Sequence, residues 1–152
     1  SLQRALDLGY RGTSHKNCKG VFKGIANSCK IYFNKKNIQG EWIISGEDLA
    51  NVGPIALLND LAVMGSIGIE HVERNGHHYF SGLSMYPRIM QGKICLFHSD
   101  LYSFTDLDFP SLIINHGSIA LGSINKAAFG CGLELDEDNL ENFGSLGLVS
   151  LN

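Results

Sequence analysis

Hydrophobic and polar positions follow two periodicities in the first half of the chain. Short extended runs at residues 10–15, 41–45 and 69–72 ("YRGTSH", "EWIIS" and "IEHV") predict strands. Between the first two runs, apolar residues recur at the spacing of one helical face, at Val21, Phe22, Ile25, Ala26, Cys29, Tyr32 and Phe33. Strands separated by helical segments of this length predict parallel βα units.

Two further helices are predicted in the same half. "LQRALDLG" is typical of the last turns of a helix that ends at Gly9. "NVGPIALLNDLAVMGSIG" accommodates Pro54 in its first turn. Its apolar stripe consists of Ile55, Leu58, Leu61, Ala62 and Met64.

The pattern changes after residue 80. "SGLSMYPRIMQGKICLFHSDLYSF" predicts a partly helical segment, and "SLIINHGSIALGSI" predicts an antiparallel hairpin about an Asn-His-Gly turn. "FGCGLELDEDNLENF" predicts a loop, a short strand and a capped final helix that begins near Asp136 or Asp138. We therefore expect a single domain over 1–152, with βα units in 1–80 and a helical segment, hairpin and terminal cap in 81–152.

Composition narrows the class of protein. A chain of 152 residues fits one domain that buries roughly 68–70 % of its unfolded surface. No apolar run approaches the roughly 20 residues of a membrane span, and the N-terminal segment does not resemble a signal peptide. The cysteines, none of them in a CxxC pair, are typical of reduced thiols: Cys18, Cys29, Cys95 and Cys131. We expect a cytoplasmic protein without a membrane partner.

Charge is distributed unevenly along the chain. Residues 1–40 hold eight of the twelve Lys and Arg, with Asp7 as their only acid, whereas "ELDEDNLE" at 134–141 is strongly acidic. A basic segment suggests nucleic acid or an anionic ligand. Because the sequence has no nucleic-acid motif or aromatic stacking platform, we do not expect nucleic acid as a partner. A solvated helix face beside a complementary acidic patch explains the asymmetry equally well.

Polar residues follow each of the three predicted strands. Catalytic groups of parallel α/β proteins gather beyond the carboxyl ends of strands. We therefore expect these residues to face one another across the opening of a single site. The predicted catalytic residues are His15, Lys16, Glu47 and Asp48. The predicted substrate-binding residues are Asn17, Asn51, Glu73, Asn75 and His77.

Each of these residues also has a structural explanation. Lys16 is either a surface lysine or a general base, if burial and neighbouring cations favour its neutral form. His15 can simply bond to the backbone, and Glu47 and Asp48 can cap the following helix. Of the adjacent His77 and His78, only one can face the site. The other histidines, at His71, His98 and His116, are expected to be structural.

The sequence resembles the C-terminal part of the enolase superfamily, in its mandelate racemase and muconate-lactonizing branch. "SHKNCKGVFKGIANSCKI" is similar to the exit of that family's sixth barrel strand, and "IISGEDLANVGPIALLNDLAVM" to its next unit. "INHGSIALGSINKAAFGCGLELDEDNLENF" resembles its closing hairpin, glycine-leucine pair and acidic helix start.

This resemblance implies the C-terminal portion of a (β/α)₈ barrel, about three βα units followed by a hairpin and a capping segment. It implies abstraction of the proton next to a small substrate's carboxylate, in lyase, dehydratase or racemase chemistry, with Mg²⁺ stabilising the enolate. Lys16 is then the base, Glu47 or Asp48 is a partner acid or substrate contact, and Glu73, Asn75 and His77 lie near the rim.

The sequence departs from the family in two ways. Val21 replaces the second glycine usual after the sixth strand, and the family's metal carboxylates would lie before residue 1. Three βα units cannot close a barrel, so they leave unpaired strand edges and an exposed apolar face. We expect a missing N-terminal half or a homo-oligomer. The alternatives are a non-enzymatic half-barrel module that assembles with a partner or itself, and an anion-binding domain.

Overall fold

The computed structural model describes residues 1–48, 51–74 and 80–133. The final helix predicted near Asp136 or Asp138, and the predicted site residues Asn75 and His77, lie outside these ranges.

Three parallel strands form the sheet of the first half. They are β1 (Gly12–His15), β2 (Ile43–Asp48) and β3 (His71–Arg74), which pair in chain order. The parallel βα arrangement predicted from the alternating periodicities is therefore confirmed. The register aligns Ser14 with Ser45, and Glu47 with Glu73.

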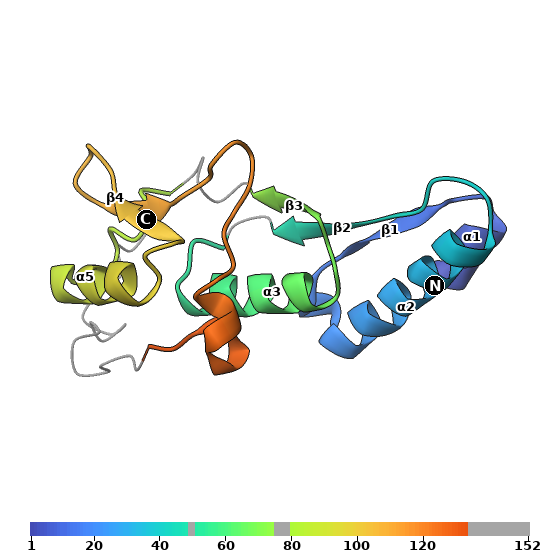
Figure 1. Cartoon of the computed structure of the whole chain (residues 1–152), viewed down its shortest axis with the longest axis horizontal. Coiled ribbons are helices and arrows are strands. Elements are labelled where there is room, and N and C mark those ends of the chain that lie inside the picture. Colours follow the sequence, from blue (N-terminus) through green and yellow to red (C-terminus); the bar gives the residue numbers. More distant parts are fainter. Residues whose placement is uncertain (49–50, 75–79, 134–152) are drawn as a thin grey trace, which may run out of the picture.

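The predicted helices of this half are also present. They are α1 (Leu2–Asp7), α2 (Val21–Asn37) and α3 (Ile55–Ser66), and a short 3₁₀ helix η1 (Asn17–Lys19) links β1 to α2. Gly9, with φ of +93°, follows α1 in a conformation that favours glycine. Figure 1 shows α2 and α3 on the same side of the sheet.

The apolar face of α2 points away from the sheet. The side toward the sheet buries Gly24, Ile31 and Asn34, whereas Phe22 and Phe33 are 88 % and 64 % exposed. The sheet side of the helix must accommodate the ring of His15, which lies against Gly24. The sequence predicted this helix and its apolar face, but the periodicity alone does not say which way that face is turned.

The second half packs against α3. It contains α5 (Arg88–Phe97), the antiparallel strands β4 (Tyr102–Phe104) and β5 (Pro110–Leu112), and the 3₁₀ helices η2 (Ile124–Lys126) and η3 (Ala128–Gly130). The hydrophobic core lies between α3 and this segment, and its buried members are Leu57, Leu58, Leu61, Leu83, Met90, Ile94, Leu101, Tyr102 and Ile124. The predicted helical segment is thus present as α5, and α3 joins the two halves.

The antiparallel pairing differs from the hairpin predicted at 111–124. At the predicted turn, Asn115 and Ser118 exchange two backbone hydrogen bonds of 2.9 Å, and they form an isolated bridge rather than a pair of strands. The first apolar run of the predicted hairpin pairs instead with the chain upstream, where Tyr102 aligns with Leu112. Tyr102 is buried and Leu112 packs against the same core, so burial favours this pairing.

In the described part of the chain, no helix combines the length and the apolar character that crossing a membrane requires.

Candidate functional site

Alternation along β1 separates two adjacent site residues. The ring of His15 lies against Gly24 of α2, so His15 faces the helices. Successive side chains of a strand point to opposite faces, and Lys16 continues the extended backbone with φ of −139° and ψ of 125°. Ser14 and Lys16 therefore lie on the face of the sheet away from α2 and α3.

The same reasoning orients β2 and β3. Gly46 faces the helix side, because a Cβ atom there would meet the sulfur of Met64 in α3. Glu47 therefore lies on the face away from the helices, and the register places Glu73 beside it. We call this surface the polar face, and its residues are Ser14, Lys16, Ser45, Glu47, His71 and Glu73.

An ion pair joins β1 and β2 on the polar face. Lys16 Nζ lies 3.2 Å from Glu47 Oε2, and the two side chains are 19 % and 32 % exposed. A hydrogen bond from Ser14 and the positive charge of Lys16 lower the pKa of Glu47, with a smaller contribution from Lys19. Glu47 is therefore a carboxylate at neutral pH, held toward the carboxyl end of β1.

His15 belongs to a different network on the helix side. It is buried, and its Nε2 lies 2.5 Å from Asn17 Oδ1. Asn17 Nδ2 donates to Asp60 Oδ1 at 2.6 Å, and Asn51 Nδ2 donates to the other carboxylate oxygen of Asp60. Because Asp60 only accepts, Asn17 must turn its oxygen toward His15, and His15 must carry a proton on Nε2. These hydrogen bonds connect the end of β1 to α3.

Asp60 is the residue of this network that the sequence reasoning missed. It lies in α3 within the run "ALLNDLAVM", where an acid interrupts otherwise apolar positions. An acid next to the buried face of a helix signals a polar partner, because an unpaired carboxylate is costly to bury. That signal was available, but it does not identify Asn17 and Asn51 as the partners.

The structure describes only some of the other predicted site residues. Glu73 is exposed on the polar face beside Glu47. Asp48 ends β2, and the structure describes its backbone only. Asn75 and His77 lie outside the described residues. The structure thus brings Lys16, Glu47 and Glu73 to one surface, and holds His15, Asn17 and Asn51 in the network around Asp60.

The described residues hold no group of three or more His, Cys, Asp or Glu that is arranged to bind a metal ion. Cys18, Cys29, Cys95 and Cys131 are all free in the structure. On the polar face, Glu47 and Glu73 are the carboxylates that lie side by side.

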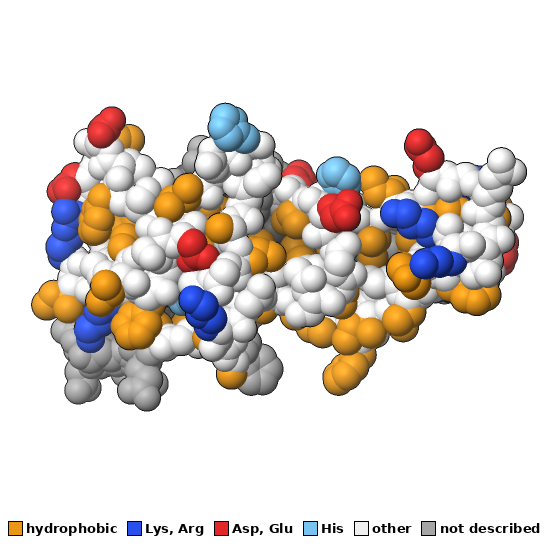
Figure 2. Space-filling view, in the orientation of Figure 1, with side chains coloured by type: hydrophobic (Ala, Val, Ile, Leu, Met, Phe, Trp, Pro, Cys, Tyr) orange, Lys and Arg blue, Asp and Glu red, His pale blue; other side chains and the backbone are white. Residues whose placement is uncertain are grey.

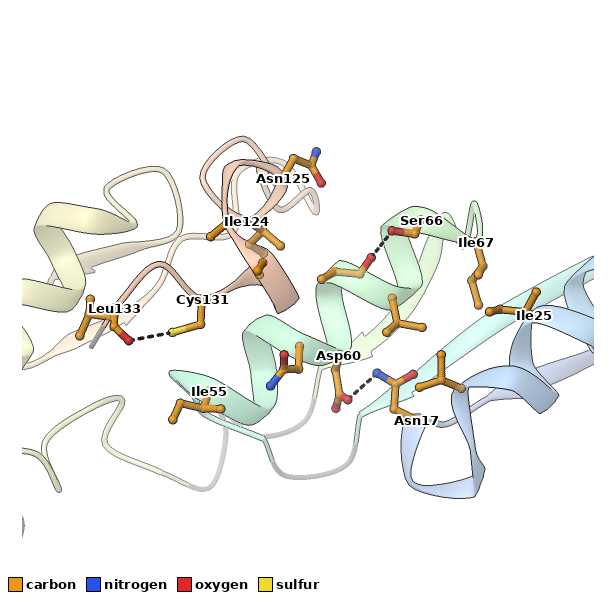
Figure 3. Close-up of a pocket in the computed structure, with 17 residues that line it drawn as sticks. Asn17, Ile25, Ile55, Asp60, Ser66, Ile67, Ile124, Asn125, Cys131 and Leu133 are labelled. Atoms are coloured by element: carbon orange, nitrogen blue, oxygen red, sulfur yellow. Dashed lines mark hydrogen bonds between the residues drawn. The ribbon is translucent and has the colours of Figure 1, made fainter. Parts of the chain in front are cut away.

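A groove of about 860 Å³ lies on the helix side of the sheet (Figure 3). It is lined mainly by apolar side chains of α2, α3 and the segment around η2 and η3, including Ile25, Val63 and Ile124. Asn17 and Asp60 line its edge, whereas Lys16 and Glu47 are not among its lining residues. The groove is therefore separate from the polar face.

His98 forms a second buried polar cluster, in the other half of the chain. Its Nδ1 lies 2.9 Å from Ser123 Oγ, and Asp100 Oδ2 accepts the Ser123 backbone N–H at 2.9 Å. Burial lowers the pKa of His98, and the negative charge of Asp100 partly opposes this. The cluster ties the end of α5 to the loop before η2, which agrees with the structural role expected for His98.

The chain was compared with known proteins. No protein-family model, no curated protein and no solved structure matches it.

Proposed function

We propose that this chain is the C-terminal part of an enolase-superfamily-like enzyme that removes the proton next to a carboxylate. The observation that carries the proposal is the ion pair between Lys16 and Glu47. It lies at the carboxyl ends of adjacent parallel strands, on the face opposite the helices. That is the position of catalytic groups in (β/α)₈ barrels.

The arrangement of the strands and helices also supports this proposal. Strands β1, β2 and β3 pair in chain order, and the intervening helices lie on one side (Figure 1). Consecutive βα units of a barrel have this arrangement, with the polar face turned toward the barrel interior. In the described sheet β1 and β3 are edge strands, so a partner half or a second copy would extend it.

Lys16 and Glu47 have complementary roles in this chemistry. The ammonium group of Lys16, which the carboxylate of Glu47 holds in place, can bind a substrate carboxylate or an enolate oxygen. For Lys16 to accept a proton, Glu47 must bind another cation or a substrate group and so release the Lys16 amine from the ion pair. Lyase, dehydratase and racemase outcomes all begin with this proton transfer.

Mg²⁺ would supply the positive charge that stabilises the enolate. Glu47 and Glu73 have the oxygen donors that Mg²⁺ prefers, but the described residues do not provide a third ligand beside them. The proposal therefore requires further ligands, which the family resemblance assigns to barrel strands other than β1, β2 and β3.

The test is exchange of the substrate proton for deuterium. Small carboxylic acids with an activated Cα–H, such as mandelate, are incubated in D₂O with Mg²⁺ and the protein, with and without a supplied N-terminal half-barrel. We expect exchange only when that half is present, and Lys16→Ala should abolish it while leaving the far-UV circular dichroism unchanged. Lys93→Ala in α5 is the matched control. Exchange that persists in Lys16→Ala would overturn the role given to Lys16.

The second candidate function is a non-enzymatic module that assembles through its charged and apolar surfaces. It is favoured by the exposed apolar side chains of α2 and by the eight Lys and Arg of residues 1–40. This function predicts association with an anionic partner that weakens as salt screens the charges. Binding that is insensitive to salt, measured by light scattering, would count against it.

A further inference from the structure

The outward side of α2 carries apolar side chains that the fold leaves in solvent. We call it the α2 outer face, and it consists of Phe22, Ile25, Ala26, Cys29, Tyr32 and Phe33, all of them exposed. Ile25 lies at its border, where it also lines the groove between α2 and α3. Hydrophobic side chains project along the lower side of the molecule in the region of α2 (Figure 2). Single exposed apolar residues are ordinary, but a contiguous group marks a surface that contacts something else.

The width of this face limits what it can contact. At 3.6 residues per turn, the six residues cover roughly 120° of the helix circumference, opposite the buried Gly24, Ile31 and Asn34. A seam that binds one partner helix is a narrower stripe. A face of this width is suited to a broad apolar surface rather than to a single helix.

Lysines border the α2 outer face on both sides. The helical spacing places Lys23 and Lys30 along one edge and Lys35 along the other. Lys36 lies at the C-terminal end, with its Nζ 5.3 Å from the centre of the Tyr32 ring. The sequence contains no Asp or Glu between residues 8 and 40, so the charged side chains that α2 itself contributes are all lysines.

We propose that the α2 outer face docks this protein on an anionic lipid surface. Helices with an apolar face that includes aromatic residues, bordered by lysines, lie in the membrane interface. The long lysine stems can lie along the apolar layer while their ammonium groups reach the lipid phosphates. A second copy of the chain would bind this face less well, because the lysines of the two copies would repel one another.

This inference goes beyond the proposed enzymatic function, because it does not use the polar face. The polar face and the α2 outer face lie on opposite sides of the βα layer, so both can act at once. The sequence-based expectation of no membrane partner rested on the lack of a spanning segment. A helix that lies on the surface needs no such segment.

The experiment is co-sedimentation of the chain with vesicles. One set consists of phosphatidylcholine alone, and the other contains phosphatidylcholine and phosphatidylserine at about 3:1. Phe22→Ser combined with Phe33→Ser removes apolar area, and Lys23→Gln and Lys35→Gln remove charge. The matched controls are Ile89→Ser with Leu96→Ser, which are 71 % and 77 % exposed on α5, and Lys93→Gln on the same helix.

We expect binding to the anionic vesicles and little binding to the neutral ones. Each lysine variant should weaken binding about fivefold, and the double Phe variant roughly tenfold or more. The α5 controls should bind like the wild type, and all variants should keep the wild-type circular dichroism.

Three outcomes would overturn the proposal. The first is no binding to anionic vesicles, or binding that the double Phe variant leaves unchanged. The second is a doubled mass in light scattering that the double Phe variant restores to a monomer, which would assign the face to a second copy. The third is preferential binding to poly-L-glutamate over vesicles, which would assign it to an acidic protein. None of these outcomes bears on the Lys16 exchange assay, so the two proposals fail independently.

Discussion

The imidazole ring of His15 occupies the space that a Cβ atom on Gly24 would fill. The ring cannot easily move away, because His15 is buried and its Nε2 is bonded to Asn17. This contact sets the distance between β1 and α2, and it explains why a glycine lies in the interior of a 17-residue helix.

Replacing Gly24 with alanine should therefore destabilise the fold. Alanine improves helix propensity by about 1 kcal/mol, but overpacking of this kind costs about 1–3 kcal/mol. We expect a net loss in the free energy of unfolding of about 1 kcal/mol or more, measured by urea denaturation.

Gly92 in α5 is the matched control for Gly24. A Cβ atom at Gly92 would meet nothing within 4 Å, so Gly92→Ala should raise the free energy of unfolding by up to about 1 kcal/mol. Combining His15→Ala with Gly24→Ala should relieve the clash. If Gly24→Ala stabilises the protein as Gly92→Ala does, the assigned packing of His15 is wrong.

We expect the carboxylate of Asp60 to contribute measurably to the free energy of unfolding. Asp60→Ala removes the carboxylate that accepts hydrogen bonds from Asn17 and Asn51, which should lower the free energy of unfolding by about 1–2 kcal/mol in urea denaturation. Asp106→Ala, at an exposed position, should change the free energy of unfolding by less than about 0.5 kcal/mol.

A second measurement tests how Asp60 orients its neighbours. The ¹⁵N shifts of the His15 ring should report a proton on Nε2 in the wild type. In Asp60→Ala the side-chain amide of Asn17 can rotate, so the preference for a proton on His15 Nε2 should weaken. A ring that is protonated on Nδ1 in the wild type would contradict the assigned network.

The pKa of Glu47 reports the geometry of the polar face. A hydrogen bond from Ser14 and the ion pair with Lys16 lower this pKa. Ser14→Ala and Lys16→Met should each raise it toward its ordinary value, as followed by ¹³C NMR of the Glu47 carboxyl group during a pH titration. Lys93→Met should leave it unchanged. No response to Ser14→Ala would show that this hydrogen bond does not form.

The buried His98 should make stability depend on pH. Because burial lowers the pKa of His98, the unfolded chain takes up a proton that the folded chain does not as pH falls below about 6.5. Stability should therefore be full above that pH and should decrease on acidification toward the lower pKa of the folded state.

The contribution of His98 can be isolated by comparing two variants in urea denaturation at pH 7.5 and pH 5.5. His98→Asn should reduce the difference in unfolding free energy between the two conditions. His116→Asn is the control, since His116 is exposed in a turn at φ of 48°, which asparagine tolerates. An equal pH dependence in the wild type and in His98→Asn would contradict this prediction.

The sequence predicted the elements of the first half because their periodicities differ clearly. It did not predict which way the apolar face of α2 turns, because periodicity defines a face but not its partner. The core between α3 and residues 80–133 depends on contacts between distant segments, such as those of Leu58 with the second half. The pairing of β4 with β5 rather than across the Asn-His-Gly turn was missed for the same reason.

The sequence identified candidate site residues, but it did not show how they are arranged. Residues that follow strand ends were identified, and Lys16, Glu47 and Glu73 do lie on one surface. His15 and Lys16 were assigned to the same site, although adjacent strand residues point to opposite faces. That separation could have been predicted, whereas the ion pair between Lys16 and Glu47 depends on strand register, which the sequence alone does not show.

Because side chains along β2 alternate between the two faces of the sheet, the strand is sensitive to insertions and deletions. Glu47 reaches Lys16 and Glu73 because it lies two positions after Ser45 on the same side of the strand. Inserting or deleting one residue between Ile43 and Glu47 would turn the carboxylate toward Met64 and bring a different side chain beside Lys16. Inserting or deleting one residue in this strand would therefore damage the site more than most single substitutions within it.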